Sequence, residues 1–268
     1  MAESTDDLRH KVALSCRILA MTGLMKDVLG HVSVRIPDAP EEMLIRCRGR
    51  EESGLLFTED DDIRRSDFSG TSSDLAGQYM LPGELPIHGE SLRLRPEVGC
   101  VIHAHPPAAL LCGLAGIEFR PMLGAYDGGF SLRLALDGIP EYPRSVLISR
   151  PDLAVELISF MGSRSVCLMR GHGVTVVGAT VEDATVRAIQ FEALCRITWQ
   201  LAVAGKTPHQ VPPPDVAEFG VTLARGQRIS RLGERAADSI WRYWVKMLDY
   251  RGALVPDISV AVPDIAPV

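Results

Sequence analysis

Two histidines that lie two residues apart are the first feature of this chain that could do chemistry. They are His103 and His105, in the stretch VGCVIHAHPP of residues 98–107. The β-branched and small apolar residues before them predict a buried strand, and strand side chains alternate between faces, so both imidazoles point the same way. Pro106 and Pro107 then end the strand, because proline cannot donate to the ladder. Such a pair could bind a metal ion, or it could be an accident of composition.

A third histidine strengthens the metal interpretation. His172 follows the apolar stretch 165–169 and is flanked by Gly171 and Gly173, which let the backbone come close to whatever the histidine contacts. Three neutral imidazoles with one open position suit a catalytic divalent metal, because a structural site is usually closed by a fourth protein ligand. The spacing alone is weak support, and imidazole ligands do not select among the metals.

Composition limits the classes of protein that the chain can belong to. It has 268 residues, 46% hydrophobic and 23% charged, which is typical of a soluble globular protein with one large domain or two small ones. The net charge of −6 argues against nucleic acid or an anionic membrane as a partner. No apolar run approaches the ~20 residues that cross a bilayer, and the acidic start MAESTDDLRHK is wrong for a leader peptide. We therefore expect a cytoplasmic protein, whose six scattered cysteines are reduced and buried.

Helical and strand patterns alternate along most of the chain and predict a layered α/β domain. The expected helices are 6–22, 84–95, 108–115, 152–161 and a long helix from Thr180 through 204; the expected strands are 31–36, 43–47, one near Ile63, the strand that ends in HAH, 145–148, 165–169 and 174–178. Residues 1–206 form the expected catalytic domain. Residues 207–268 form a Pro-rich linker and a helical tail, which we expect to pack on the same or a neighbouring subunit.

Two longer stretches resemble the class II aldolase/adducin family, which includes fuculose-phosphate aldolase and ribulose-phosphate 4-epimerase. They are LPGELPIHGESLRLRPEVGCVIHAHP and RGHGVTVVGATVEDATVRAIQFEALCRI, and the resemblance extends over roughly residues 8–204. It implies a three-layer α/β/α sandwich around a mostly antiparallel sheet, followed here by the C-terminal helices, and a homotetramer. It also implies one divalent metal per chain (Fe²⁺, Mn²⁺, Zn²⁺ or Co²⁺) held by His103, His105 and His172.

The resemblance gives Glu84 the role of acid/base. A carboxylate beside a metal can carry a proton to or from the substrate. In the alternative interpretation, Glu84 only complements the dipole of the helix that it begins. His88 lies one helical turn further on and is expected to be a structural partner that faces Glu84.

The departures from the family pattern concern the substrate. Sugar-phosphate aldolases of the family hold phosphate with a Gly-Asn-x-Ser loop and a Ser-Ser pair before the acidic residue. Here LGHVSVR places His31 in the asparagine position, and LPGE has no serine. A sugar phosphate is therefore not expected. GHVSVR and the stretch 124–148 resemble a subgroup that handles non-phosphorylated acids, including decarboxylases of hydroxylated aromatic or pyridine dicarboxylates and non-heme iron oxygenases.

Metal-dependent cleavage of a carbon–carbon bond in an aromatic hydroxy-carboxylate, with decarboxylation first, is the function that we expect. After loss of CO₂, an acid such as Glu84 or His31 would protonate the carbanion. A second carboxylate on the small acidic substrate needs a cation. The candidates are Arg35, Arg46 and Arg48, unless these line a solvated hairpin face.

Three further residues could contact the substrate. Ser33 could donate a hydrogen bond or merely point outward. Tyr126 lies in a Gly-rich loop that could close over the metal, or in a plain surface turn. Trp241 shares one helix face with Trp244, Val245 and Leu248; it could line an aromatic pocket between subunits, or it could be a packing residue.

Two other reactions remain open from the sequence. One is oxidative cleavage by Fe²⁺ of a hydroxyphenylpyruvate- or mandelate-type side chain in secondary metabolism. The other is aldol cleavage of a small hydroxy-keto acid. A non-enzymatic scaffold role is disfavoured, because all three histidines and Glu84 are present.

Overall fold

A seven-stranded sheet is the centre of the part of the chain that the structure describes. The computed structural model describes residues 3–123, 130–229 and 236–250, and all their side chains except those of 222–229 and 236. The strands, in the order β3-β2-β1-β4-β7-β6-β5, are β1 His31–Ile36, β2 Ala39–Arg46, β3 Ile63–Asp67, β4 Cys100–Ala104, β5 Glu141–Tyr142, β6 Val166–Met169 and β7 Gly173–Gly178. Every neighbouring pair is antiparallel except β5 with β6. The expected mostly antiparallel sheet is confirmed.

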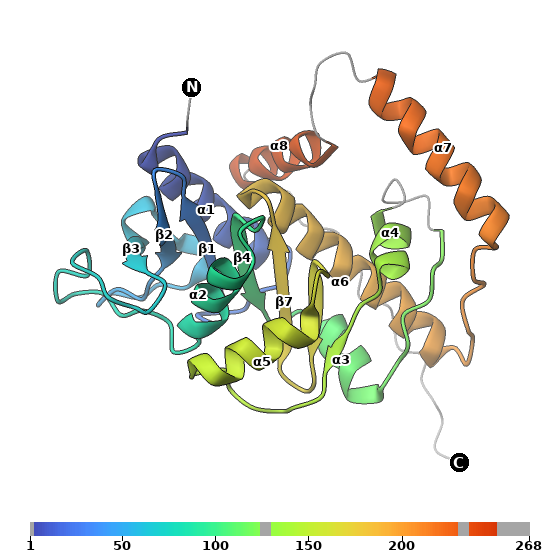
Figure 1. Ribbon diagram of the computed structural model, residues 1–268, viewed down its shortest axis with the longest axis horizontal. Helices are drawn as coiled ribbons and strands as arrows, with labels where there is room; N and C mark the ends of the chain where they lie inside the picture. Colours follow the sequence, from blue (N-terminus) through green and yellow to red (C-terminus); the bar gives the residue numbers. More distant parts are fainter. Residues whose placement is uncertain (1–2, 124–129, 230–235, 251–268) are drawn as a thin grey trace.

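Helices cover both faces of this sheet (Figure 1). They are α1 Thr5–Met21, α2 Leu85–Leu94, α3 Pro107–Ala115, α4 Phe130–Asp137, α5 Pro151–Met161, α6 Val181–Val203, α7 Pro213–Ile229 and α8 Ala236–Asp249, with the short 3-10 helices η1 Leu55–Phe57 and η2 Asp60–Asp62. One apolar core, the α1/α6 core, lies between one face of the sheet and α1, α3, α6 and α8. A second, the α2/α5 core, lies between the other face and α2 and α5. The three layers of the sandwich are therefore present.

Strand alternation decides which side chain enters which core. In β1 and β4, Val32 and Ile102 enter the α1/α6 core, whereas Val101 enters the α2/α5 core. Ser33 pairs with Val101 and His31 with His103, and all four therefore lie on the α2/α5 face. This alternation places the histidines of β1 and β4 on one side of the sheet.

Helix ends agree with the sequence signals. Ser4 caps α1 and forms a capping box with Asp7. Thr180 caps α6 by accepting a hydrogen bond from the backbone N–H of Asp183, at 3.3 Å. All six cysteines are free and buried, as expected.

The predicted strand 145–148 is wrong. The edge strand is Glu141–Tyr142, which pairs with β6, and residues 143–150 are irregular. The backbone N–H of Ile148 instead donates to the carboxylate of Glu84, at 2.9 Å. Helix α4 was not predicted, and the Pro-rich linker gives way to α7 at Pro213.

The C-terminal helix α8 packs on α1 and α6 of the same chain. Trp241 is 8% exposed in the α1/α6 core, and Trp244, Val245 and Leu248 pack against that core from the same helix face. The shared face predicted from the sequence is confirmed. Helix α7 lies at the periphery (Figure 1). No helix among the described residues is long and apolar enough to cross a bilayer.

Because Trp241 is a core residue, its truncation tests this packing. We expect Trp241→Ala to lower the free energy of unfolding by about 3 kcal/mol or more, since it removes a buried indole and leaves a cavity. Urea denaturation followed by circular dichroism measures the change. Lys246→Ala, an exposed position of the same helix, is the control. Equal stabilities of the two variants would contradict the burial of Trp241.

Candidate metal centre

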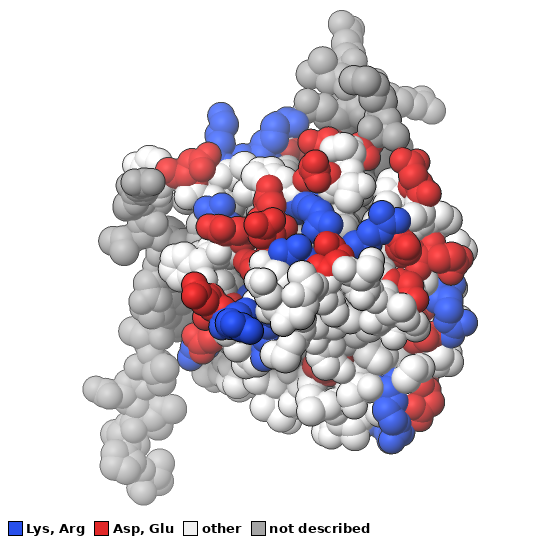
Figure 2. Space-filling model, turned by 90° about the vertical axis from the view of Figure 1, so that its left-hand side faces the viewer, with Lys and Arg blue, Asp and Glu red and all other residues white. Residues whose placement is uncertain are grey.

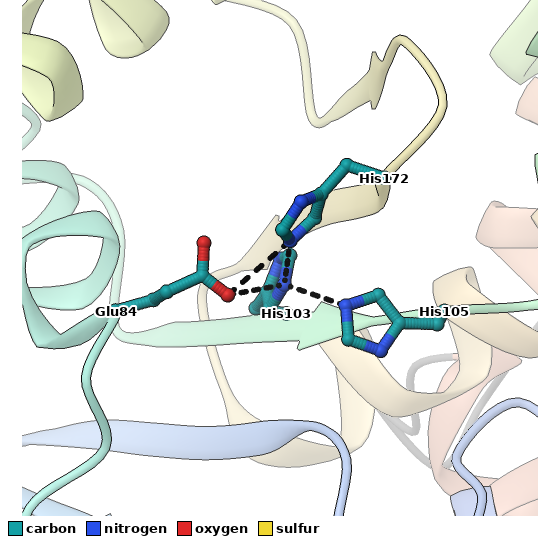
Figure 3. Close-up of side chains that lie close together, drawn as sticks. All are labelled: Glu84, His103, His105 and His172. Atoms are coloured by element: carbon teal, nitrogen blue, oxygen red, sulfur yellow. Dashed lines mark hydrogen bonds and ion pairs between the residues drawn. The ribbon is translucent and has the colours of Figure 1, made fainter. Parts of the chain in front are cut away.

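Four side chains with metal-binding atoms converge at one end of the sheet. One nitrogen or oxygen from each of Glu84, His103, His105 and His172 lies within 4.8 Å of the other three. Nε2 of His103 is 3.1 Å from Nε2 of His105 and 3.2 Å from Nε2 of His172. Oε2 of Glu84 lies 3.3 Å from Nε2 of His103 and 3.2 Å from that of His172. Figure 3 shows all four side chains pointing toward one place. The structure thus brings together the three histidines and the carboxylate that the sequence singled out.

The sheet fixes the three histidines relative to one another. His103 is in β4 and fully buried, and His105 follows that strand. His172 lies in the tight turn between β6 and β7, where its N–H donates to the carbonyl of Met169 at 3.0 Å. Because β4 pairs with β7 and β7 with β6, the turn arrives beside the end of β4.

The glycines around His172 permit this approach, as expected. A Cβ at Gly173 would lie 2.3 Å from the carbonyl oxygen of Ala104 and 2.6 Å from Cδ2 of His105. Gly171 has φ +64°, a conformation that favours glycine. A side chain at position 173 would therefore push the β6–β7 turn away from β4.

Glu84 is at the N-cap position of α2, but its side chain caps nothing. Oε1 accepts the hydrogen bond from Ile148 N–H, and Oε2 faces the histidines. The carboxylate is thus aimed into the centre rather than at the N–H groups of its own helix. The interpretation of Glu84 as a helix-dipole residue has no support from this geometry.

The protonation states suit metal binding. Burial, with the neighbouring His103 and His172, lowers the pKa of His105 to about 4, so this ring is neutral at physiological pH. Burial by itself would raise the pKa of Glu84, but hydrogen bonds and charge from His103 and His172 outweigh it and hold that pKa well below its usual range. A neutral imidazole and an ionised carboxylate are the forms that bind metal.

The spacing of the ligand atoms also fits an ion. Tetrahedral ligands at about 2.0–2.1 Å from a metal are about 3.3 Å from one another. Four of the six separations within the cluster, those of His103 from His105 and His172 and those of Glu84 from His103 and His172, are 3.1–3.3 Å and close to that value. The residues present therefore fit the divalent metal that the sequence led us to expect.

His31 lies beside the cluster but is not part of it. It pairs with His103 across β1 and β4, and the two rings stack with centroids 5.3 Å apart. Its Nδ1 contacts Nε2 of His88 at 3.1 Å, and Nδ1 of His88 contacts the Ser33 hydroxyl at 2.7 Å. His88 is thus a structural partner, as expected, but of His31 and Ser33 rather than of Glu84. Ser33 is fully buried, so the structure does not support a substrate contact for it.

Two of the three candidate arginines have other partners. The guanidinium of Arg35 donates to the carbonyls of Pro40, Leu92 and Val98, near the end of β1 opposite His31. Arg46 is 3% exposed and forms an ion pair with Glu52. Neither guanidinium reaches the candidate metal centre, because each is held by these contacts at the β1–β2 hairpin.

Arg48 remains a candidate for binding substrate. Its backbone pairs with Met80, four residues before Glu84, and its guanidinium donates to the carbonyl of Val28 at 2.9 Å, three residues before His31. It therefore lies against both segments that lead into the site.

Two predicted substrate contacts find no place here. Tyr126 lies outside the described residues. Trp241 is buried in the α1/α6 core, whereas His31 and His103 lie on the α2/α5 face, so within one chain the sheet separates them.

Glu192 is a residue that the sequence reasoning missed. It is 3% exposed in α6, and its carboxylate accepts hydrogen bonds from the backbone N–H groups of Ala108 and Ala109, both at 3.0 Å. These N–H groups belong to the first turn of α3, directly after HAHPP. Glu192 thus holds the segment that follows His105. The available signal was a carboxylate within the apolar stretch AIQFEALC.

Comparisons with known proteins agree with this architecture. The family model of the class II aldolase and adducin N-terminal domain matches residues 10–199. A 3,4-dihydroxyphthalate decarboxylase of Arthrobacter keyseri is 44% identical over 214 residues, 79% of this chain and 85% of the relative. A 3,4-dihydroxyphthalate decarboxylase of Terrabacter sp. is 43% identical over 235 residues, which are 84% of this chain and 97% of the relative.

Solved structures show the same fold. An aldolase II superfamily protein of Pseudomonas syringae superposes with a TM-score of 0.74 at 19% identity, over 94% of this chain and 96% of that one. L-fuculose 1-phosphate aldolase of Glaciozyma antarctica superposes with a TM-score of 0.71 at 16% identity, over 93% of each.

The close approach at Gly173 gives a direct test of the centre. We expect Gly173→Ala to weaken metal binding by about 10- to 100-fold, the range found for changes that support the ligands of a metal, because the added methyl displaces His105 or the turn of His172. Competition with a chelator measures the affinity. Gly220→Ala, where the new methyl meets nothing within 4 Å, is the control. Unchanged affinity in Gly173→Ala would show that the turn is not needed for the ligands.

Proposed function

The chain belongs to the class II aldolase and adducin family, and from that premise we propose that it is a metal-dependent lyase that decarboxylates a hydroxylated aromatic dicarboxylate of the 3,4-dihydroxyphthalate type. The observation that carries this proposal is the convergence of three histidine side chains and a carboxylate at the end of β4. The substrate class is supported by the two decarboxylases that are more than 40% identical to this chain and match most of its length.

The metal has a defined place in this proposal. A divalent cation held by His103, His105 and His172 would draw electron density from a hydroxyl group and an adjacent carboxylate of the substrate, so that the ring accepts an electron pair more readily. Fe²⁺, Mn²⁺, Zn²⁺ and Co²⁺ all suit three imidazoles. We propose one such ion per chain.

Glu84 is the proposed proton carrier. Decarboxylation breaks the bond between the ring carbon and the carboxylate carbon; CO₂ leaves, and the electron pair stays on the ring carbon, which needs one proton. Oε2 of Glu84 faces the point where the imidazoles converge, while the N–H of Ile148 holds Oε1. The carboxylate can take the proton of the substrate hydroxyl and return it to the ring carbon. The phenolate that this leaves takes one proton from water, so one solvent proton is consumed per CO₂ released and the product is a dihydroxybenzoate.

The second carboxylate of the substrate needs a cation. We propose Arg48, whose guanidinium donates to the carbonyl of Val28 and has no other hydrogen-bond partner among the described residues. It lies against the segments that lead to His31 and Glu84. A guanidinium can grip a carboxylate through two parallel hydrogen bonds.

A homotetramer remains our proposal for the assembly. It is supported by large apolar residues that stay exposed in the single chain, among them Leu29, Phe57 and Met80, at 49%, 63% and 67%. Figure 2 shows one face on which charges of both signs gather in the upper half while the lower half is mostly uncharged. We also keep residues 1–206 as the proposed catalytic unit and 207–268 as its tail.

The proposed reaction is tested by CO₂ release from 3,4-dihydroxyphthalate under argon. We expect one CO₂ and one dihydroxybenzoate per substrate, loss of turnover after chelation, and recovery when a divalent metal is restored. His172→Ala should stay inactive after metal is added back. Substrate-dependent uptake of O₂ with a hydroxyphenylpyruvate-type acid, and no CO₂ release under argon, would replace this proposal with the oxygenase.

A second test separates the role of Glu84 from metal binding. We expect Glu84→Gln to keep about one metal per chain but to lower kcat by about 10²-fold or more, since the amide cannot carry the proton. Metal analysis and CO₂ release are measured on the same preparation. Glu97→Gln, at an exposed carboxylate, is the control. Loss of the metal from Glu84→Gln would make Glu84 a ligand instead of the proton carrier.

A further inference from the structure

A buried chain of three polar side chains leads from the interior to the metal centre. It runs from the Ser33 hydroxyl to Nδ1 of His88, at 2.7 Å, and from Nε2 of His88 to Nδ1 of His31, at 3.1 Å. Ser33 and His88 are fully buried, and His31 is 9% exposed. The ring of His31 stacks on His103 with an interplanar angle of 24°. These contacts join β1, α2 and β4 on the α2/α5 side of the sheet.

The direction of the hydrogen bonds follows from counting protons, beginning at Ser33. In the described part of the chain, Nδ1 of His88 is the one hydrogen-bond partner of the Ser33 hydroxyl. A buried O–H without an acceptor is costly, so Ser33 donates to Nδ1. That nitrogen therefore carries no proton.

The same count continues through His88 to His31. Burial, with the charge of His103 adding to it, lowers the pKa of His88 to about 3, so the ring is neutral and has its single proton on Nε2. This Nε2–H donates to Nδ1 of His31. His31 consequently accepts at Nδ1 and carries its own proton on Nε2.

We propose that Ser33 and His88 are positioning residues that hold His31 in the Nε2–H tautomer, so that His31 donates a hydrogen bond to a substrate oxygen instead of becoming a fourth imidazole ligand of the metal. Both ring nitrogens are then committed: Nδ1 to His88, and Nε2 to its proton. The absence of His31 from the converging ligand set agrees with this assignment.

The ligand that this N–H fits is an anionic oxygen beside the metal. The carboxylate and phenolate oxygens of a hydroxylated aromatic acid are such acceptors, and to that extent the inference rests on the proposed function. A neutral imidazole N–H is a good hydrogen-bond donor but a weak acid. His31 is therefore assigned to substrate orientation, and the proton for the ring carbon stays with Glu84.

The tautomers can be read directly by ¹⁵N NMR on the full chain labelled with ¹⁵N-histidine, whether or not a substrate turns over. Signals are assigned by single His31→Gln and His88→Gln variants. We expect both residues to show a protonated Nε2 and an unprotonated Nδ1. A proton on Nδ1 of either ring overturns the proposal, even if the protein proves to be a decarboxylase.

Kinetics on a matched pair of variants give the functional readout. We expect Ser33→Ala to lower kcat/KM with 3,4-dihydroxyphthalate by about tenfold, the worth of one hydrogen bond, to shift the His88 and His31 tautomer signals, and to keep its metal. Ser33→Thr, which retains the hydroxyl, should restore both kcat/KM and the tautomer signals. Ser91→Ala is the control, because Ser91 is a buried serine of α2 whose hydroxyl bonds only within its own helix, to the carbonyl of Ile87. A Ser33→Ala variant that loses stability but keeps its tautomers would leave Ser33 with a packing role alone and overturn the proposal.

Discussion

The position of β4 between β1 and β7 is the constraint on which the site depends. Antiparallel pairing on both sides fixes His103 against His31 in one neighbour and against Thr175 in the other. The same pairing brings the β6–β7 turn, with His172, to the end of β4. Because these side chains stand on paired strands or tight turns, their spacing is set by backbone hydrogen bonds rather than by loop conformation, as a site that holds a metal requires.

The cost of this arrangement is a set of buried polar groups. Nε2 of His103 lies 3.1–3.2 Å from Nε2 of two other imidazoles, and Glu84 adds an ionised carboxylate to the same place. Such groups destabilise a fold unless they are paired. A cation bound among them would offset that cost and would thereby couple metal binding to folding stability. The Ser33–His88–His31 chain follows the opposite principle, since each of its members is paired with a neighbour and only the Nε2–H of His31 is left for a substrate oxygen.

The sequence predicted the elements and the convergence of the histidines better than it predicted what packs against them. Strand alternation and the HAH and GHG motifs placed three histidines together, because periodicity and glycine freedom are local properties. The element that covers a strand face, in contrast, comes from a distant part of the sequence and cannot be predicted from local patterns. Ser33 could not be told from a substrate contact until α2 placed His88 above it, and Trp241 is a core residue because α8 folds back on α1 and α6. The strand predicted at 145–148 failed for the same reason, since Ile148 gives its N–H to a carboxylate 64 residues away.

That last contact separates two functions of the site. The three converging histidines are held by β4 and by the β6–β7 turn, whereas one oxygen of Glu84 is tied to the irregular connection between β5 and α5. Changes in this connection can therefore re-aim the carboxylate while the three imidazoles stay where they are. In such a scaffold, substitutions in the β5–α5 connection can change the position of the carboxylate without changing the imidazoles, because the two are held by different parts of the chain.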